Sequence, residues 1–345
     1  MKSLTIIFIL SFTILTINLN LSHAQVGAVE HMSMIGNEYQ DISKEMWQYI
    51  SAVAKGKSAR KIDKRRQDLI QAMNQARQNI FRLPTYQGDA TLKDSTVAYL
   101  SLCNIVLRED YDKILDLEEI AEQSYDLMEA YLKAKEMADQ KLDQAQERLD
   151  LVEEAYAAKY NINLVEGEES KLSSRLNKAS DVFKYYNVVY LIFFKSYKQE
   201  MYLMDALQKQ DVNAIEQNRN ALSLMAKEGL ELLDTIKSFN RDISLVGACQ
   251  GVLRFYQIEA DERIDIFRDF HMLQENLNMI KTALESKKPK DRTQEEIDVF
   301  NETINEYNTM VAKVNKTNEE LNKFRTKYLD EWTTTSNDFL SRHIN

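Results

Sequence analysis

Glycine and proline are scarce in this chain, with 8 glycines and 2 prolines among 345 residues. Ordinary proteins contain about 7% glycine and 5% proline, and sandwiches and barrels need such residues at their frequent turns. Their scarcity therefore argues against a β-rich fold. Apolar residues instead recur at three- and four-residue spacing along most of the chain, a period typical of amphipathic helices. We predict an all-α fold.

Residues that carry catalysis or bind metals are also few. Three histidines follow residue 24, at positions 31, 271 and 343, and none belongs to a Glu-x-x-His motif. A di-iron helical bundle would need that motif on two helices. The chain also lacks a P-loop, a Gly-x-Ser-x-Gly and a Gly-x-Gly-x-x-Gly sequence. We therefore expect a non-enzymatic protein with no cofactor and no metal site.

The sequence contains only two cysteines, Cys103 and Cys249. An oxidising compartment would permit a disulfide between them. Both also occupy apolar helical positions, where a free cysteine packs as a small hydrophobic residue. Buried free thiols are the favoured interpretation, and the disulfide remains the alternative.

The one long apolar run lies at the N-terminus. Lys2 precedes an apolar stretch over 4–21, and Ser22-His23-Ala24 then forms a small-x-small cleavage site. We predict a signal peptide over 1–24 and an exported protein, located in the periplasm, at the cell surface or outside the cell. A membrane anchor is the alternative, but polar residues interrupt the run. Gln25 stands where a lipoprotein would need cysteine.

The net charge and the lack of further long apolar stretches restrict the kinds of partner that the chain can bind. The formal net charge is −10 and the pI is about 5.2, which argues against non-specific binding to nucleic acid or to an anionic membrane. No later stretch is long and apolar enough to span a bilayer. We expect a partner that is another protein or a cell-envelope component. The sequence leaves the oligomeric state open.

Turn residues divide the first half into helices. We predict helices over 29–54 and from Ser58 to the loop at 84–89, which is centred near Gln87 and Gly88. Neither glycine nor proline occurs over 91–166. One straight helix of that length would exceed about 110 Å at 1.5 Å per residue, so we place a turn within 135–140.

The second half has clearer boundaries. Helices are predicted over 170–210, 212–239, 244–287 and from Thr293 to the C-terminal region. Thr293 and Glu296 form a capping box after the turn over 287–291. The tail after Trp332 is polar, and we expect it to fray.

The second half also matches the first at an offset of 153 residues. Apolar matches arise by chance in helical sequences, but three polar matches are more specific: Ser58 with Asp211, Asp89 with Asp242, and Arg66 with Arg219. We therefore predict two tandem four-helix antiparallel bundles, over 25–166 and 167–345, related by an internal repeat.

The stretch over 55–66 contains a dense group of lysines and arginines in a chain that is acidic as a whole. In an antiparallel hairpin, residues at equal distances from the turn face each other. Arg66 then lies level with Glu109 and Asp110. A buried guanidinium needs such partners, so we predict internal ion pairs between Arg66 and these two carboxylates.

The same rule applies to the repeat, where Arg219 is expected to lie near Glu259 and Glu262. We predict ion pairs there as well.

An exposed anion-binding face is the alternative interpretation of the basic stretch. Its ligand would be a phosphate, a lipid headgroup or a polysaccharide. The residues of this face are Lys57, Arg60, Lys61 and Lys64.

The stretch over 182–204 is apolar on nearly every helical face. Such a helix is usually buried on all sides, and we expect a central helix between the two halves. The alternative is an aromatic cleft for an amphipathic ligand, lined by Tyr186, Tyr190 and Phe194.

Three segments carry a resemblance to a family. They are GKSARKIDKRRQDLI (56–70), the loop over 84–89 and DYDKILDLEEIAEQSYDLMEAY (110–131). Together they resemble uncharacterised helical surface proteins of spirochaete and bacteroidete type, over about the first half of the mature chain. The resemblance implies an exported surface protein. It carries over no activity and no catalytic or ligand-binding residue.

Two functions therefore stand as expectations. The first is a non-enzymatic surface or periplasmic protein that presents helical faces to another protein or to an envelope polymer. The second is a carrier that holds an amphipathic small molecule in an aromatic cleft between the bundles.

Overall fold

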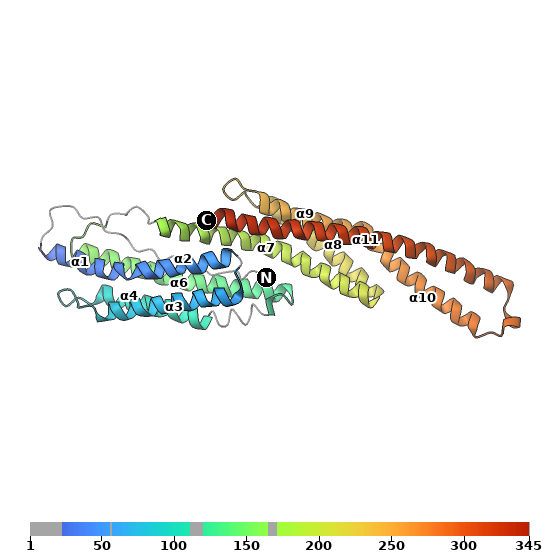
Figure 1. Ribbon diagram of the computed structural model, residues 1–345, viewed down its shortest axis with the longest axis horizontal. Coiled ribbons are helices and arrows are strands. Elements are labelled where there is room, and N and C mark those ends of the chain that lie inside the picture. The colour runs from blue at the N-terminus through green and yellow to red at the C-terminus, as the bar shows by residue number, and fades with distance from the viewer. Residues whose placement is uncertain (1–22, 56, 111–119, 165–170, 345) are drawn as a thin grey trace. The chain divides into compact units, whose positions relative to one another are not determined.

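The computed structural model describes residues 23–55, 57–110, 120–164 and 171–344 (Figure 1). Within these ranges the chain is helical and contains no β-strand beyond two isolated bridges, so the all-α prediction is confirmed. The predicted signal peptide falls almost wholly outside the described residues. No helix in the described part of the chain combines the length and the apolar character needed to cross a membrane.

The chain divides into two compact units. Unit 1 contains Met1–Asn187 and Asn337–Asn345, and unit 2 contains Val188–Ser336. Both boundaries fall inside long helices, α7 (Lys171–Lys209) and α11 (Gln294–Ile344). This division differs from the boundary at residue 167 expected from the sequence, which lies outside the described residues.

Unit 1 is built from helices that pack against one another along the chain. α3 packs against α2 and α4, and α4 packs against α6. Met46, Leu69 and Leu100 are fully buried in this core. The elements are α1 (His23–Asn37), α2 (Tyr39–Ala54), α3 (Ala59–Arg82), α4 (Thr91–Ile105), the π-helix η1 (Val106–Asp110) and α6 (Tyr125–Lys159).

Two helix boundaries of unit 1 differ from the predictions. The single helix expected over 29–54 is broken at Glu38, directly after Gly36 and Asn37, which have low helix propensity. The turn expected within 135–140 is absent, because α6 runs through it without interruption. Those six residues include no glycine or proline, and the break comes earlier, where the Ser124 hydroxyl accepts from the Leu127 N–H at 3.3 Å.

Unit 2 continues from α7 into a second series of helices. These are α8 (Val212–Thr235), α9 (Ser244–Ile258), the π-helix η2 (Glu259–Arg263), α10 (Asp265–Glu285), the 3₁₀ turn η3 (Pro289–Asp291) and the first part of α11. The predicted capping box opens α11. The Glu296 N–H donates to Thr293 Oγ1 at 3.3 Å, and the Thr293 N–H donates to Glu296 Oε2 at 3.1 Å.

The C-terminal tail is ordered helix, so the expected fraying after Trp332 is wrong. α11 continues to Ile344, and Phe339 and Leu340 are buried. Phe339 stacks on Tyr185 of unit 1 with ring centroids 5.6 Å apart. The tail is polar in composition, but its buried apolar residues Phe339, Leu340 and Ile344 anchor it in unit 1.

One helical hairpin of unit 1 and one of unit 2 consist of helices with the same lengths. Every first and last residue of α8, α9 and η2 lies 153 positions after the corresponding residue of α3, α4 and η1. Even the two π-helices correspond. Such segments are rare and add one residue to a helical turn, so their shared position is a specific similarity.

The turn of the first hairpin forms as predicted around Gln87 and Gly88. Both have positive φ, at 50° and 79°, the backbone of a type I′ turn. Tyr86 and Asp89 form the isolated bridge that closes it. The Asp89 carboxylate accepts from the Thr91 N–H at 2.9 Å, which caps the start of α4.

The turn of the second hairpin has the same construction. Asn240 and Arg241 have φ of 49° and 67°, and Phe239 bridges to Asp242. The Asp242 carboxylate accepts from the Ser244 N–H at 2.9 Å. The arginine in a left-handed position shows that the hairpin imposes this turn even where glycine is absent.

Close packing inside the second hairpin gives a test. An added Cβ at Gly229 would lie 2.5 Å from Leu253 Cδ2 and 3.2 Å from Ile192 Cγ2. Gly229→Ala is therefore expected to destabilise the protein by about 1–3 kcal/mol, as measured by urea unfolding followed by circular dichroism.

Gly247→Ala is the matched control, since a Cβ there meets nothing within 4 Å. This variant should be unchanged or stabilised by up to about 1 kcal/mol. Equal stabilities of the two variants would contradict the described packing.

Candidate functional site

A basic face lies at the start of α3. Lys57 precedes the helix, and Arg60, Lys61 and Lys64 follow at the spacing of one helical face. All four side chains are exposed, and no ion pair to any of them is found within the described residues. The acidic stretch that the sequence places opposite falls mainly on 111–119, outside those residues. The arrangement forms a cluster of four solvent-facing cations.

Arg66 has the opposite environment and is only 7% exposed. Its Nε and Nη2 donate to Asp63 Oδ1 at 3.2 and 2.9 Å. Its Nη1 donates to the carbonyl of Leu107 at 3.2 Å, inside the π-helix η1. The burial predicted for this arginine is observed. The side chains of its predicted partners, Glu109 and Asp110, lie outside the described residues.

Arg219, the counterpart of Arg66, binds carboxylates other than those predicted. Its Nη1 lies 2.5 Å from Asp265 Oδ1, and its Nη2 lies 3.2 Å from Glu216 Oε1. The predicted partners were Glu259 and Glu262. Glu262 is exposed, and Glu259 binds another arginine. The prediction fails because the π-helix η2 adds a residue to the turn and brings Asp265 round to face α8.

A buried charge cluster that was not predicted from the sequence joins three elements of unit 2. Arg325 of α11 donates from Nε to Glu200 of α7 and from Nη2 to Glu259 of η2, both at 2.5 Å. Its Nη1 donates to Asn322. Glu259 is 0% exposed. Arg325 follows Leu321 and precedes Tyr328 in the apolar stripe of α11, the same kind of position that drew attention to Arg66.

This cluster places two carboxylates on one guanidinium. Oε2 of Glu259 is buried, and no hydrogen-bond partner for it is found in the described part of the chain. Burial raises the pKa of Glu259 to about 8, Arg325 opposes that rise, and Glu200 adds to it. Burial also raises the pKa of Glu200 against the effect of Arg325. Near neutral pH, Glu259 is therefore mostly protonated and the cluster is close to neutral.

The predicted aromatic residues are buried in their own units. Tyr186 belongs to unit 1, while Tyr190 and Phe194 belong to unit 2. The rings of Tyr190 and Phe194 stack at 5.8 Å. The expectation that this helix is buried on all sides is wrong, because Val188 and Met201 on the same helix are exposed.

A histidine and three tyrosines close one end of the first hairpin. His31 Nε2 donates to the Pro84 carbonyl at 3.0 Å, so its Nδ1 accepts from the Tyr156 hydroxyl at 3.2 Å. The rings of Tyr86 and Tyr160 meet edge to face at 5.1 Å. Burial lowers the pKa of His31. Because both ring nitrogens are engaged, this cluster is a packing site and offers no free nitrogen to a metal or substrate.

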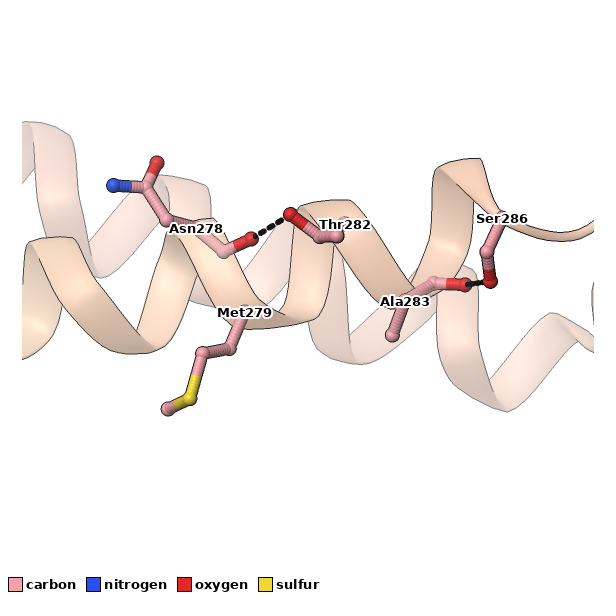
Figure 2. A pocket seen from close by; sticks show the side chains of 5 residues that line it. All are labelled: Asn278, Met279, Thr282, Ala283 and Ser286. Atoms are coloured by element: carbon pink, nitrogen blue, oxygen red, sulfur yellow. Dashed lines mark hydrogen bonds between the residues drawn. The ribbon is translucent and has the colours of Figure 1, made fainter.

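A shallow groove runs along one face of α10 (Figure 2). Its volume is about 490 Å³. The Thr282 hydroxyl donates to the Asn278 carbonyl at 2.8 Å, and the Ser286 hydroxyl donates to the Ala283 carbonyl at 2.7 Å. Since both hydroxyls bind their own helix, the groove presents mainly carbon and the Met279 thioether. Its lining residues are Asn278, Met279, Thr282, Ala283 and Ser286.

Groups of side chains able to hold a metal ion are absent from the part of the chain that the structure describes. Cys103 and Cys249 are both buried free thiols. Burial raises the pKa of Cys103 to about 12 and raises that of Cys249 further. Neither thiol is placed or ionised for nucleophilic chemistry.

Comparison with models of known protein families, with curated proteins and with solved structures finds no match to this chain. The resemblance to bacterial surface proteins therefore stays a prediction.

The buried cluster predicts an unusual pH dependence. The pKa of Glu259 rises from 4.5 to about 8 on folding, so stability should fall as pH rises between these values. Glu259→Gln mimics the protonated acid. It should match the wild type near pH 5 and be more stable at pH 9 by up to a few kcal/mol, since each pH unit between the two pKa values corresponds to about 1.4 kcal/mol.

Urea unfolding at pH 5, 7 and 9 measures this effect. Glu262→Gln is the control, because Glu262 lies in the same π-helix and is exposed. It should change stability by less than about 0.5 kcal/mol at every pH. A wild type and a Glu259→Gln variant with the same pH dependence would contradict the assignment.

The thiols give a second prediction. Neither Cys103 nor Cys249 should react with Ellman's reagent in the native protein at pH 8, because both are buried with raised pKa values. Denaturation in guanidinium without reductant should expose both thiols. A disulfide between them would instead leave no reactive thiol after denaturation.

Proposed function

We propose that this chain is an exported, non-enzymatic helical protein that binds an anionic component of the cell envelope through the basic face of α3. The face consists of Lys57, Arg60, Lys61 and Lys64, and all four are exposed. The proposal of export relies on the sequence of residues 1–24. The proposal of binding relies on a comparison between the two hairpins.

That comparison is the observation that carries the proposal. The residues 153 positions after the four cations are Gln210, Asn213, Ala214 and Gln217, and none is charged. The hairpin of unit 2 therefore forms with the same element lengths and the same turn but without these charges. The cations are not needed to build the hairpin, which favours a role in binding.

The two arginines of the hairpins show the contrast. Arg66 and Arg219 occur at equivalent positions, and each binds an acid three residues earlier, Asp63 or Glu216. Charges with a structural role thus recur in both hairpins. The exposed charges of α3 occur in only one.

The dimensions of the face indicate the class of partner. Residues 57–64 span about 10 Å along the chain direction at 1.5 Å per helical residue, so a polymer with closely spaced phosphate or carboxylate groups can contact several cations together. The start of a helix also carries a partial positive charge from its free N–H groups. Exposed charges are screened over about 8 Å at physiological salt, so we expect salt-sensitive binding.

We also propose that the two hairpins derive from an internal duplication, within two tandem helical bundles. The equal bounds of six elements, the paired type I′ turns and the paired π-helices support this proposal. After the hairpins the units differ, because α6 of unit 1 has no equivalent in the long α10–α11 hairpin of unit 2.

The carrier function is not favoured by a specific observation. Tyr186, Tyr190 and Phe194 are buried, and the groove described above lies on α10.

The binding proposal is tested by giving α3 the residues of its counterpart. The variant Lys57→Gln, Arg60→Asn, Lys61→Ala, Lys64→Gln should keep its stability and lose affinity for long-chain polyphosphate by at least about tenfold, or about 1.4 kcal/mol. Calorimetric titration at 50 and 150 mM salt measures the affinity. Wild-type binding should weaken at the higher salt.

A control variant removes the same number of positive charges elsewhere. It replaces Lys313, Lys316, Lys323 and Lys327 of α11, all exposed, with glutamine. Its affinity should stay within about twofold of the wild type. Equal losses in the two variants would show that only net charge matters and would contradict a site on α3.

A further inference from the structure

The helix α10 has two different faces without charged residues. One face meets α11, where Phe270 stacks on Tyr307 with ring centroids 5.4 Å apart. The other face points to solvent and contains the groove described above. Five exposed residues follow it at spacings of four and three: Met272, Asn276, Met279, Ala283 and Ser286. We call these five residues the outer stripe.

The outer stripe is unusual for a solvated surface. Met272 is 54% exposed and Met279 is 65% exposed, yet the stripe contains no charge in a chain of which 28% of residues are charged. Alternating four- and three-residue spacing is the pattern by which one helix packs against another. The stripe thus has the form of a helix interface with no partner helix in the described part of the chain.

The side chains of the stripe change in size along the helix. The two large residues are Met272 and Met279, at the start and the centre, and the small residues Ala283 and Ser286 follow at the end, where the groove lies (Figure 2). An antiparallel copy of the same stripe, centred on Met279, would place Met272 of each chain over Ser286 of the other. Large residues would then fill the hollows left by small ones.

The charges around the stripe favour the same alignment. In the segment 261–275, Asp265 and Asp269 already bind arginines of the same unit, and the exposed acids that remain are Asp261, Glu262 and Glu275. In the turn over 287–292, Lys287 already binds Glu296, and the bases that remain are Lys288, Lys290 and Arg292, beside the single acid Asp291. Antiparallel pairing brings the acidic start of each α10 beside the basic turn of the other, whereas parallel pairing would bring like charges together.

We propose that α10 is a self-association surface, through which two copies of this chain pair antiparallel about Met279. The interface is isologous, with the same five residues contributed by each copy. The helix has 21 residues, or about 32 Å at 1.5 Å per residue. A contact through one helix of this length lies at the small end of specific interfaces, so a dissociation constant on the order of micromolar is expected. This association does not involve α3 and is independent of the proposed binding to an anionic polymer.

Cysteine cross-linking tests both the contact and its direction. In Met279→Cys, the new thiol lies on the symmetry axis and faces its own copy, while Cys103 and Cys249 are buried. A short bismaleimide should therefore convert this variant to a covalent dimer. Leu151→Cys is the control, since Leu151 is 65% exposed and lies in unit 1. It should cross-link at least tenfold more slowly.

The direction is tested with Met272→Cys and Ser286→Cys. Mixed together, these two variants should cross-link faster than either does alone. The reverse result would overturn the antiparallel arrangement.

Sedimentation velocity of the wild type over 1–100 µM should show a reversible dimer, and Met279→Glu should abolish it without changing the monomer's melting temperature. A wild type that stays monomeric over this range, with Met279→Cys no more reactive than Leu151→Cys, would overturn the proposal.

Discussion

The burial of arginine in apolar helical interfaces is the constraint on which much of this structure depends. A guanidinium removed from water must find acceptors, or the helix that bears it cannot pack. Arg66 uses an acid on its own helix and a carbonyl of the π-helix η1, and Arg219 uses an acid on its own helix and Asp265 just beyond η2. Arg325 joins α7, η2 and α11 through Glu200 and Glu259. In each case one of the acceptors lies in a π-helix or just beyond it. The extra residue in those turns therefore helps to set which groups face the arginine, and so the register of the neighbouring helices.

The two hairpins can also be compared with each other to separate charged residues that stabilise the fold from those that bind a partner. A sequence alone does not distinguish a cation that stabilises a fold from one that binds a partner. Here the same hairpin is built twice, and the structural charges occur in both copies. The four exposed cations of α3 occur in one copy only, while the equivalent positions of α8 are uncharged. This difference separates the two roles without any comparison to another protein.

Local signals in the sequence were sufficient to predict most of the helices and the turns between them. Gln87-Gly88 and the Thr293 capping box were predicted correctly, because each depends on residues close together in the chain. The break at Glu38 was missed because Gly36 and Asn37 were taken as part of one helix. The turn within 135–140 was placed from the length of the segment alone, although neither glycine nor proline occurs there. The partner of Arg219 was wrong because equal spacing from a turn assumes regular α-helix, and η2 is not regular. The cluster of Glu200, Glu259 and Arg325 was missed because it links residues as far as 125 positions apart. The basic face of α3 was named from the sequence, but its exposure could only be read from the fold.

The buried cluster has two carboxylates, Glu200 and Glu259, but only one arginine. The folded protein therefore holds a proton on Glu259. At pH 7 an unfolded Glu259 has released its proton, whereas the folded chain keeps it, because the pKa lies near 8. Folding therefore takes up close to one proton from the surrounding buffer at this side chain. The heat of unfolding measured by calorimetry then includes the ionisation heat of whichever buffer accepts that proton. Two buffers at the same pH should give different enthalpies for the same structural transition.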